Sequence, residues 1–535
     1  MSVAESYDLI DRPWLLVRSL DGTVSESSLM DTFRTADRLA GLVGDVPTQV
    51  FALTRLLLAI VHRALDGVLD EDAWALMWQG DGLPVERIES YLGRHRSRFD
   101  LLHPQTPFFQ VGGLHTTKGE VSALDKLVAD VPNGEPFFSM RLDRSIALSL
   151  PEAARWLVHC HAFDPSGIKS GAVGDDRVKH GKGYPIGTGW SGYLGGVLPE
   201  GASLLETLLL NLVPTTPQDL PTWEREAPGP QEVERTPSGA VDLYTWQSRR
   251  IRLVSEQDRV TAVLICNGDR ITPQNKHVVE THTAWRRSQT QEKKLGSSTP
   301  VYMPLEHMPE RLIWRGLQAM LPSTTTSAQR TEAAARLSPE VLRWISRLTD
   351  ARLLPKGQPL RLRTIGMTYG SQSSTTAEIV DDAVTLHAVL LDQGAHELRQ
   401  VVLDCVHDAE NAAYALGGLA VGLAEAAGTR ESDGPRARAG ERAYARLDPL
   451  FRTWLARLGP DADPIDSKTS WHTDAAKAVR RLAEQLIAGA PLAAWQGRVI
   501  NQRWWCTAHA DRKFDRDLRA ALPMARQWAA KKEVT

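Results

Sequence analysis

Residues 398–419 read LRQVVLDCVHDAENAAYALGGL, and the pattern in this stretch constrains the architecture of the C-terminal part of the chain. Its apolar side chains recur every three or four residues, at Leu398, Val402, Cys405, Ala409, Ala412, Leu416 and Leu419. This spacing places them on one stripe of an α-helix, which is the side that packs against a core. Similar patterns recur over 438–458, 472–489 and 508–530. We therefore predict a four-helix bundle over residues 391–535.

The N-terminal part of the chain mixes strand and helix patterns. Residues 13–18 (PWLLVR) form a short apolar run, and the pair Asp21-Gly22 that follows is typical of a hairpin turn. Between Val50 and Leu65 the apolar residues follow helical spacing. Further strands are expected over 244–254 and 260–266, and further helices over 308–320 and 339–348. We predict a mixed α/β (α+β) domain over residues 1–390, with the boundary to the bundle near residue 390.

The composition of the chain excludes few classes of protein. The chain has 535 residues, 42% hydrophobic and 24% charged, and a net charge of −3 that argues against a uniformly basic coat but allows local basic patches. No apolar run approaches the ~20 residues that span a bilayer, and residues 1–10 do not resemble a signal peptide. Four widely separated cysteines favour neither a disulfide framework nor a zinc ribbon. We expect a cytoplasmic protein with no cofactor, no metal and no membrane contact.

Patterns that would indicate catalysis or nucleotide binding are missing or out of context. Residues 187–192 (GTGWSG) match GxGxxG by letter, but no strand precedes them and no helix follows, as a dinucleotide site requires. The chain has no Walker A loop, no GxSxG and no HExxH. We therefore predict no catalytic residue. An enzyme of unrecognised class, such as a nuclease that uses Asp381 and Asp382, stays open as an alternative.

Two basic loops could contact phosphate. Residues 164–201 contain eleven glycines, and Lys169, Arg177, Lys179 and Lys182 lie among them. A second cluster runs from Lys276 through Arg286 and Arg287 to Lys293 and Lys294. Glycine lets a backbone approach a ligand closely, and flexible cations suit phosphate, although each loop alone could equally be a solvated surface.

A third segment, residues 369–374 (YGSQSS), lies between two stretches with strand-like alternation. Gly370 offers a turn there, so a small polar hairpin tip is expected. Physical chemistry alone assigns it no further role.

Together these segments resemble the CasA family, the large subunit of the type I-E CRISPR surveillance complex (Cascade). The resemblance rests on motifs in order along essentially the whole chain: RPWLLVR, FDLLHPQTPFFQVGG, SGIKSG, ETLLLNLV, TWQSRRIRL, NGDRITPQNKH and YGSQSS. It implies a subunit that is not an enzyme, that binds double-stranded target DNA and that recognises the protospacer-adjacent motif (PAM) from the minor groove. It further implies help in opening the duplex for R-loop formation during antiviral defence. The implied partners are crRNA, the backbone and small subunits, and a separate helicase–nuclease recruited afterwards.

The resemblance also implies site residues. A glycine loop that faces the minor groove corresponds to Gly167, Lys169, Ser170 and Gly171, with Gly171 as the expected point of closest approach. A lysine finger corresponds to Lys293 or Lys294, with Lys276 as the alternative. A wedge corresponds to Gly370, Ser371, Gln372 and Ser373, with Gln372 at its tip. A loop that meets the crRNA handle and the neighbouring backbone subunit corresponds to residues 133–144, including Asn133, Phe137, Phe138 and Arg141.

These implied roles agree with the physics of DNA recognition. The minor groove mainly separates A·T from G·C pairs, so a reader made of glycine backbone and one lysine should tolerate several PAM sequences. Inserting a wedge there unstacks bases at roughly a few kcal/mol per step. The alternative to DNA recognition is a scaffold that bridges proteins without touching DNA.

Overall fold

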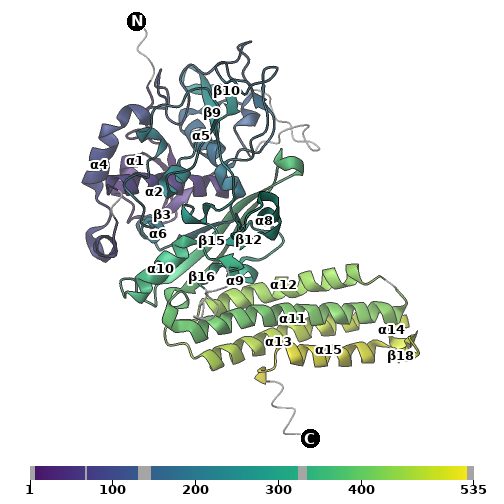
Figure 1. Cartoon of the computed structure of the whole chain (residues 1–535). Coiled ribbons are helices and arrows are strands. Elements are labelled where there is room, and N and C mark those ends of the chain that lie inside the picture. Colours follow the sequence, from purple (N-terminus) through teal and green to yellow (C-terminus); the bar gives the residue numbers. More distant parts are fainter. Residues whose placement is uncertain (1–5, 67–68, 130–145, 323–333, 430, 527–535) are drawn as a thin grey trace. The chain divides into compact units, whose positions relative to one another are not determined.

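The computed structural model describes residues 6–66, 69–129, 146–322, 334–429 and 431–526 (Figure 1). The chain divides into two compact units. The first comprises Met1–Arg311, Thr325–Leu348 and Arg361–Ala383, and the second comprises Leu312–Thr324, Thr349–Leu360 and Val384–Thr535. A single boundary near residue 390 stays a prediction.

Helix α2 (Pro47–Ala64) is the central helix of the first unit. Pro47 occupies its first turn, where no helical N–H is needed, and nearly all of its residues are buried. The helix expected between residues 50 and 65 is therefore confirmed. The other helices of this unit are α1 (Leu29–Arg34), α3 (Glu71–Leu76), α4 (Val85–Arg94), α5 (Leu150–Phe163), α6 (Leu204–Asn211), α7 (Ala240–Tyr244), α8 (Gln289–Leu295) and α10 (Glu340–Asp350, which ends two residues into the second unit).

The predicted N-terminal hairpin is confirmed. Strands β1 (Leu15–Ser19) and β2 (Val24–Ser27) pair in antiparallel fashion, with Leu15 opposite Ser27. On its other side β1 pairs with β3 (Leu39–Val43), so the sheet order is β2-β1-β3 and β3 is an outer strand.

Three further three-stranded sheets follow, and they lie in the first unit except for the first two residues of β15 and the last four of β16. Their orders are β4-β10-β9 (Leu148–Ser149, Arg259–Asn267, Arg249–Glu256), β13-β12-β14 (Tyr302–Pro304, Trp285–Arg287, Arg336–Leu337) and β16-β15-β7 (Thr376–His387, Pro359–Tyr369, Gly196–Glu200). Two short pairs add β5 (Lys169–Ser170) with β6 (Lys182–Gly183), and β8 (Val233–Glu234) with β11 (Asp269–Arg270). The strand expected from residue 244 begins only at Arg249, because residues 240–244 form α7.

The second unit is a four-helix bundle, as predicted. Figure 1 shows α11 (His396–Ala427), α12 (Asp433–Leu455), α13 (Pro464–Ala488) and α15 (Thr507–Ala521) lying alongside one another. The apolar stripe of α11 from Leu398 to Leu419 is buried as expected. The sequence did not reveal the short helix α14 (Leu492–Gln496) or the hairpin of β17 (Arg498–Ile500) and β18 (Arg503–Trp505) between α13 and α15.

One predicted helix is largely wrong. Of the helix expected over residues 308–320, only a 3₁₀ turn (Ile313–Gly316) and the single turn α9 (Leu317–Met320) form. Pro309 and Pro322 bracket this stretch and Gly316 interrupts it, so an uninterrupted helix is disfavoured. Within the described ranges, none of the helices has the length and apolar content to cross a membrane.

Candidate nucleic-acid interface

The glycine loop starts at the end of α5 and is held there by a buried carboxylate. Asp164 follows the last residue of α5 and is 6% exposed. Its Oδ2 accepts a hydrogen bond of 2.5 Å from Arg249 Nε on β9, and the Lys169 Nζ lies 2.5 Å from the same oxygen. Arg249 also donates to the carbonyl of Gly187, at 2.8 Å. Asp164 and Arg249 therefore fix both ends of the segment 164–187.

In this arrangement the charge of Lys169 is paired with that of Asp164. Burial by itself would raise the pKa of Asp164, but the attraction of Lys169 and Arg249 outweighs it and lowers that pKa. Burial also lowers the pKa of Lys169, against the attraction of Asp164. Because its side chain is only 14% exposed and ion-paired, Lys169 holds the loop in shape and does not present a free cation.

The glycine with an open backbone in this loop is Gly167, whereas Gly171 is packed. The buried Gly171 donates its N–H to the Gly181 carbonyl at 2.9 Å, and a Cβ there would lie 2.7 Å from the Gly181 carbonyl carbon. The group that approaches Gly171 closely is therefore the backbone of Gly181 in the same chain. Gly167 has a φ of 134°, and a Cβ there would meet no atom within 4 Å. Ser170, on β5 opposite Lys182, is half-buried.

Residues 370–375 form the tip between the long strands β15 and β16, as the sequence indicated. The Gly370 N–H donates to the Thr375 carbonyl, and the Ser373 N–H to the Gly370 carbonyl, each at 2.9 Å. Gln372 and Ser373 have φ values of 56° and 53°. Left-handed backbone is unfavourable for residues other than glycine, so the turn stores strain at the position where the Gln372 side chain is exposed.

The base of this hairpin is fastened next to the glycine loop. Tyr369 Oη donates a 2.7 Å hydrogen bond to the carbonyl of Phe163, the last residue of α5, and burial raises the pKa of this tyrosine. Residues of both segments, Asp164 and Lys169 together with Thr375 and Thr376, are among those that line a cavity of about 260 Å³. Two of the three predicted DNA-reading segments are therefore neighbours in space.

The third segment, on α8, is exposed and follows β12 along the chain. Ser288 caps α8, Lys293 and Lys294 lie in its last turn, and Gly296 ends it with a φ of 61°. Both lysines are exposed, and within the described chain neither has an ion-pair partner. Thr283, just before β12, pairs with Gly196 of β7, the neighbour of β15.

Electrostatics link the same two regions. Burial raises the pKa of Glu306, just after β13, and Arg286 on β12 opposes this rise. The charge of Glu306 in turn contributes to the raised pKa of Tyr369, although burial is the larger cause.

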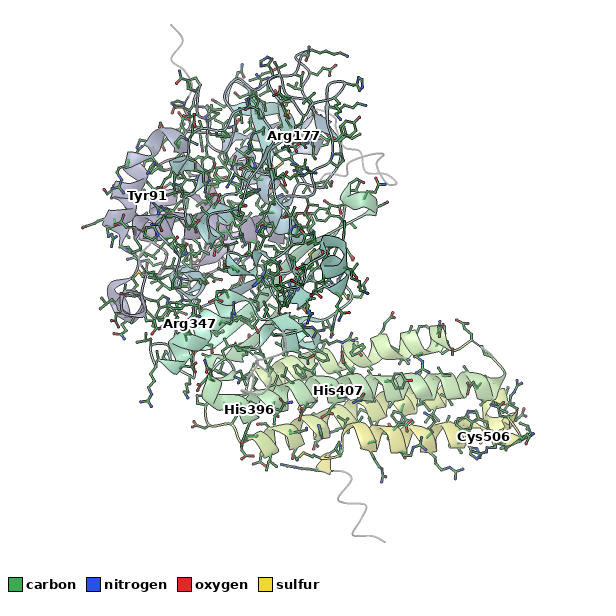
Figure 2. The ribbon with its side chains drawn as sticks, viewed as in Figure 1. Tyr91, Arg177, Arg347, His396, His407 and Cys506 are labelled. Carbon is green, nitrogen blue, oxygen red and sulfur yellow. The ribbon has the colours of Figure 1, made fainter. Side chains whose placement is uncertain are left out.

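The remaining residues predicted to contact nucleic acid or partner subunits do not share one environment. Residues Asn133, Phe137, Phe138 and Arg141 lie outside the described residues. The half-buried Lys276 donates to the Gln274 carbonyl at 3.3 Å, and burial lowers its pKa. Arg177, labelled in Figure 2, pairs with Glu232 at 2.8 Å, whereas Lys179 and Lys182 are exposed.

The two acids of the nuclease alternative do not form a metal site. Asp381 accepts hydrogen bonds from Arg363 Nε and Nη2, at 2.6 and 2.8 Å, and Asp382 accepts the N–H of Ala383 at 2.8 Å. Across the part of the chain that the structure describes, no three His, Cys, Asp or Glu residues are grouped so that they could hold a metal ion.

Sequence reasoning missed the residues that position the site. Arg249 is 85 residues from Asp164 and Tyr369 is 206 residues from Phe163, and single-sequence patterns carry no pairing information at such separations. The only available indication was that each lies inside or next to a motif already singled out, at SGIKSG, TWQSRRIRL and YGSQSS.

Comparison with known proteins identifies the family. The model of the CRISPR-associated protein Cse1 family matches residues 8–482. The curated CasA/Cse1 protein of Thermus thermophilus is 33% identical over 333 residues, which cover 60% of this chain and 61% of that protein. The alignment thus spans less than two thirds of the relative's length.

Comparison with solved structures supports the same family. The crystal structure of Thermobifida fusca Cse1 is 50% identical and covers 97% of this chain and 99% of its own, with a TM-score of 0.91. A chain of a CRISPR RNA-guided surveillance complex shares the fold at 20% identity, with a TM-score of 0.64 and coverage of 90% and 99%. A mixed α/β unit with a C-terminal helical bundle is the fold that this chain shares with solved Cse1 structures. The chain belongs to the Cse1 (CasA) family.

Proposed function

We propose that this chain is the large subunit of a crRNA-guided type I-E Cascade complex that binds double-stranded target DNA, recognises the PAM from the minor groove and helps to open the duplex. The observation that carries the proposal is the strained, exposed tip at Gln372, fastened through Tyr369 beside the open backbone of Gly167. A rigid projection next to an open glycine backbone suits a groove reader with a wedge. The kinship with Cse1 proteins and the shared fold with a surveillance-complex chain support the assembly.

In this proposal the three segments divide the work. Gly167 approaches the groove with its backbone, Lys293 and Lys294 neutralise phosphate, and Gln372 inserts at the first base step beyond the PAM. Lys169 acts through Asp164, which keeps the loop in shape. Opening at that step suffices because exchanging DNA duplex for RNA–DNA heteroduplex is nearly balanced in free energy. Cleavage belongs to the helicase–nuclease that the complex recruits after the R-loop forms.

Replacing both α8 lysines is expected to weaken binding of PAM-containing DNA. In the assembled complex, Lys293→Ala with Lys294→Ala should raise the Kd for a short PAM duplex roughly ten-fold and reduce the salt slope of log K by about one to two. Fluorescence anisotropy at several salt concentrations measures both quantities. Arginine at both positions should keep the salt slope, since the charges remain.

The matched control removes two exposed cations from the bundle, Lys477→Ala with Arg481→Ala on α13, and should leave the affinity for this short duplex unchanged. A wild-type complex that binds duplexes with and without the PAM equally would favour the scaffold alternative. Mg²⁺-dependent cleavage that is lost in Asp381→Asn would favour the nuclease.

Altering the hairpin tip is expected to separate binding from opening. Gln372→Ala with Ser373→Ala should leave the initial PAM affinity within about two-fold and slow strand opening roughly ten-fold, because the wedge no longer fills the space of an unstacked base. The opening rate is followed by the fluorescence of 2-aminopurine placed next to the PAM. Gln372→Asn keeps an amide and tolerates left-handed backbone, so it should retain most of the rate. Equal opening rates in all variants would refute the wedge.

A further inference from the structure

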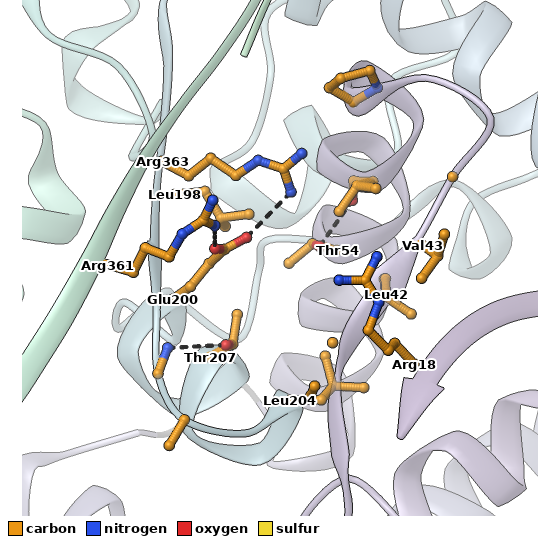
Figure 3. A pocket seen from close by; sticks show the side chains of 17 residues that line it. Arg18, Leu42, Val43, Thr54, Leu198, Glu200, Leu204, Thr207, Arg361 and Arg363 are labelled. Atoms are coloured by element: carbon orange, nitrogen blue, oxygen red, sulfur yellow. Dashed lines mark hydrogen bonds and ion pairs between the residues drawn. The ribbon is translucent and has the colours of Figure 1, made fainter. Parts of the chain in front are cut away.

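A second cavity, of about 500 Å³, lies in the first unit between two outer strands (Figure 3). One wall consists of five consecutive residues, 40–44, which belong to β3 and the residue after it. The opposite wall carries Leu198 and Glu200 of β7 together with Arg361 and Arg363 of β15. Successive strand residues point to opposite faces, so a cavity bounded by five in a row reaches along the edge of β3. Arg18 of β1, which pairs with Gly41, lines the same cavity from the neighbouring strand.

The backbone of β3 is open along this edge. Among the described strands β3 pairs only with β1. In an antiparallel pair every second residue directs its N–H and C=O groups away from the partner, so the outward groups of β3 are available over roughly 16 Å. Ala40 is exposed and Gly41, Leu42 and Val43 are partly exposed, so the edge is accessible. Such an edge is a template for an added strand.

The charges around the cavity favour an acidic occupant. Its lining holds the three guanidinium groups of Arg18, Arg361 and Arg363 but the single carboxylate of Glu200. Glu200 binds Arg361 and lies 3.3 Å from Arg363, which also binds Asp381 outside the lining. Arg361 is still 51% exposed. Figure 3 shows Arg18 on the wall opposite Arg361 and Arg363; it is exposed, and no described residue forms an ion pair with it.

We propose that the edge of β3 accepts an extended acidic segment of a partner protein, which adds to the sheet as a strand. Its backbone bonds to the outward groups of β3, and its carboxylates reach Arg18 and Arg361. Val50, Leu198 and Leu204 form an apolar floor for the side chains between the carboxylates. A small organic anion would use the guanidinium groups but would leave the strand edge unfilled. This surface does not depend on the DNA-reading role proposed above.

The direct test uses a defined probe, a labelled six-residue peptide with alternating glutamate and valine. The full-length protein should bind it with a Kd of roughly tens of micromolar in fluorescence anisotropy. Methylating the backbone nitrogen of every second peptide residue blocks strand addition without changing charge. Two such peptides are needed, one methylated in each register, because either set of alternating nitrogens can face β3. At least one of them should bind ten-fold or more weakly, because its backbone hydrogen bonds to β3 are lost. A peptide that alternates lysine and valine should not bind.

Variants of the protein locate the site. Arg18→Glu should weaken binding of the acidic peptide about ten-fold, through loss of one attraction and gain of one repulsion. Arg38→Glu makes the same charge change just before β3 but outside the cavity lining, so it should leave the Kd unchanged. In hydrogen exchange, amides within residues 40–44 should gain protection when the peptide is bound.

Three outcomes would overturn the proposal. These are no saturable binding up to about 1 mM peptide, binding that survives backbone methylation in both registers, and protection confined to residues other than 40–44. Displacement of the peptide by inorganic phosphate or adenosine monophosphate at similar concentration, with no protection of β3, would indicate a small-anion site instead.

Discussion

Lowering the pH from 7.5 to 5.5 is expected to destabilise the first unit by several kcal/mol. Four histidines in its core are held neutral by burial, which lowers the pKa of His62, His159 and His282 to about 3 and that of His161 to about 4. Two of these rings, for example, have hydrogen-bonding partners in the core. His159 Nε2 lies 2.9 Å from Thr48 Oγ1, and His161 Nε2 lies 2.8 Å from the Phe109 carbonyl.

The direction of these pKa shifts determines how the stability of the first unit changes with pH. In the unfolded chain each histidine takes up a proton as the pH falls through about 6.5, whereas in the folded protein it does not do so until about 3 to 4. The stability is therefore complete above pH 6.5 and is lost progressively below it. One pH unit below 6.5 each histidine removes about 1.4 kcal/mol, so four remove at most about 5 to 6 kcal/mol.

Urea unfolding followed by tryptophan fluorescence at the two pH values measures the loss. His161→Gln removes one titrating group and should reduce the pH dependence by ~1.4 kcal/mol. The exposed His180 is the control, and His180→Gln should leave the dependence unchanged. Equal unfolding midpoints at pH 7.5 and 5.5 would show that these histidines do not remain neutral in the folded state.

Glu280→Gln is expected to destabilise the first unit by about 3–5 kcal/mol, because it leaves a buried guanidinium without its counter-charge. Glu280 is buried and accepts hydrogen bonds from Arg55 Nη1 and Nη2, each at 2.8 Å. It also accepts Trp190 Nε1 at 2.6 Å and the His282 N–H at 3.0 Å. Burial would raise the pKa of Glu280, but Arg55 outweighs burial and keeps that pKa low.

This ion pair joins α2 to the segment that leads into β12 and α8, so its loss should also disturb the position of Lys293 and Lys294. The free energy of unfolding by urea is the direct measurement. Replacing both partners, Arg55→Met with Glu280→Leu, should recover much of the loss, since no buried charge then remains unpaired. The control is the exposed pair of Arg87 and Asp66, where Asp66→Asn should change stability by less than about 1 kcal/mol. A Glu280→Gln protein as stable as wild type would mean that water reaches Arg55.

Local patterns in the sequence were sufficient for the secondary structure wherever one residue's neighbours decide its environment. The three- and four-residue spacing from Leu398 to Leu419 predicted a buried helical stripe, and Asp21-Gly22 predicted the first hairpin. They failed where breakers interrupt a pattern, as around Gly316. The order of motifs, from RPWLLVR to YGSQSS, was sufficient to indicate the family.

The tertiary structure decided which of the candidate residues are free to act. Lys169 and Lys293 are alike in sequence, a lysine in a basic, loop-rich stretch, yet Asp164 neutralises the first and the second is exposed. Gly171 and Gly167 are four residues apart, yet one packs on Gly181 and the other has an open backbone. Periodicity records which side of an element faces the core, but a charge is neutralised or a backbone covered by residues distant along the chain. Such partners are defined only once the chain has folded.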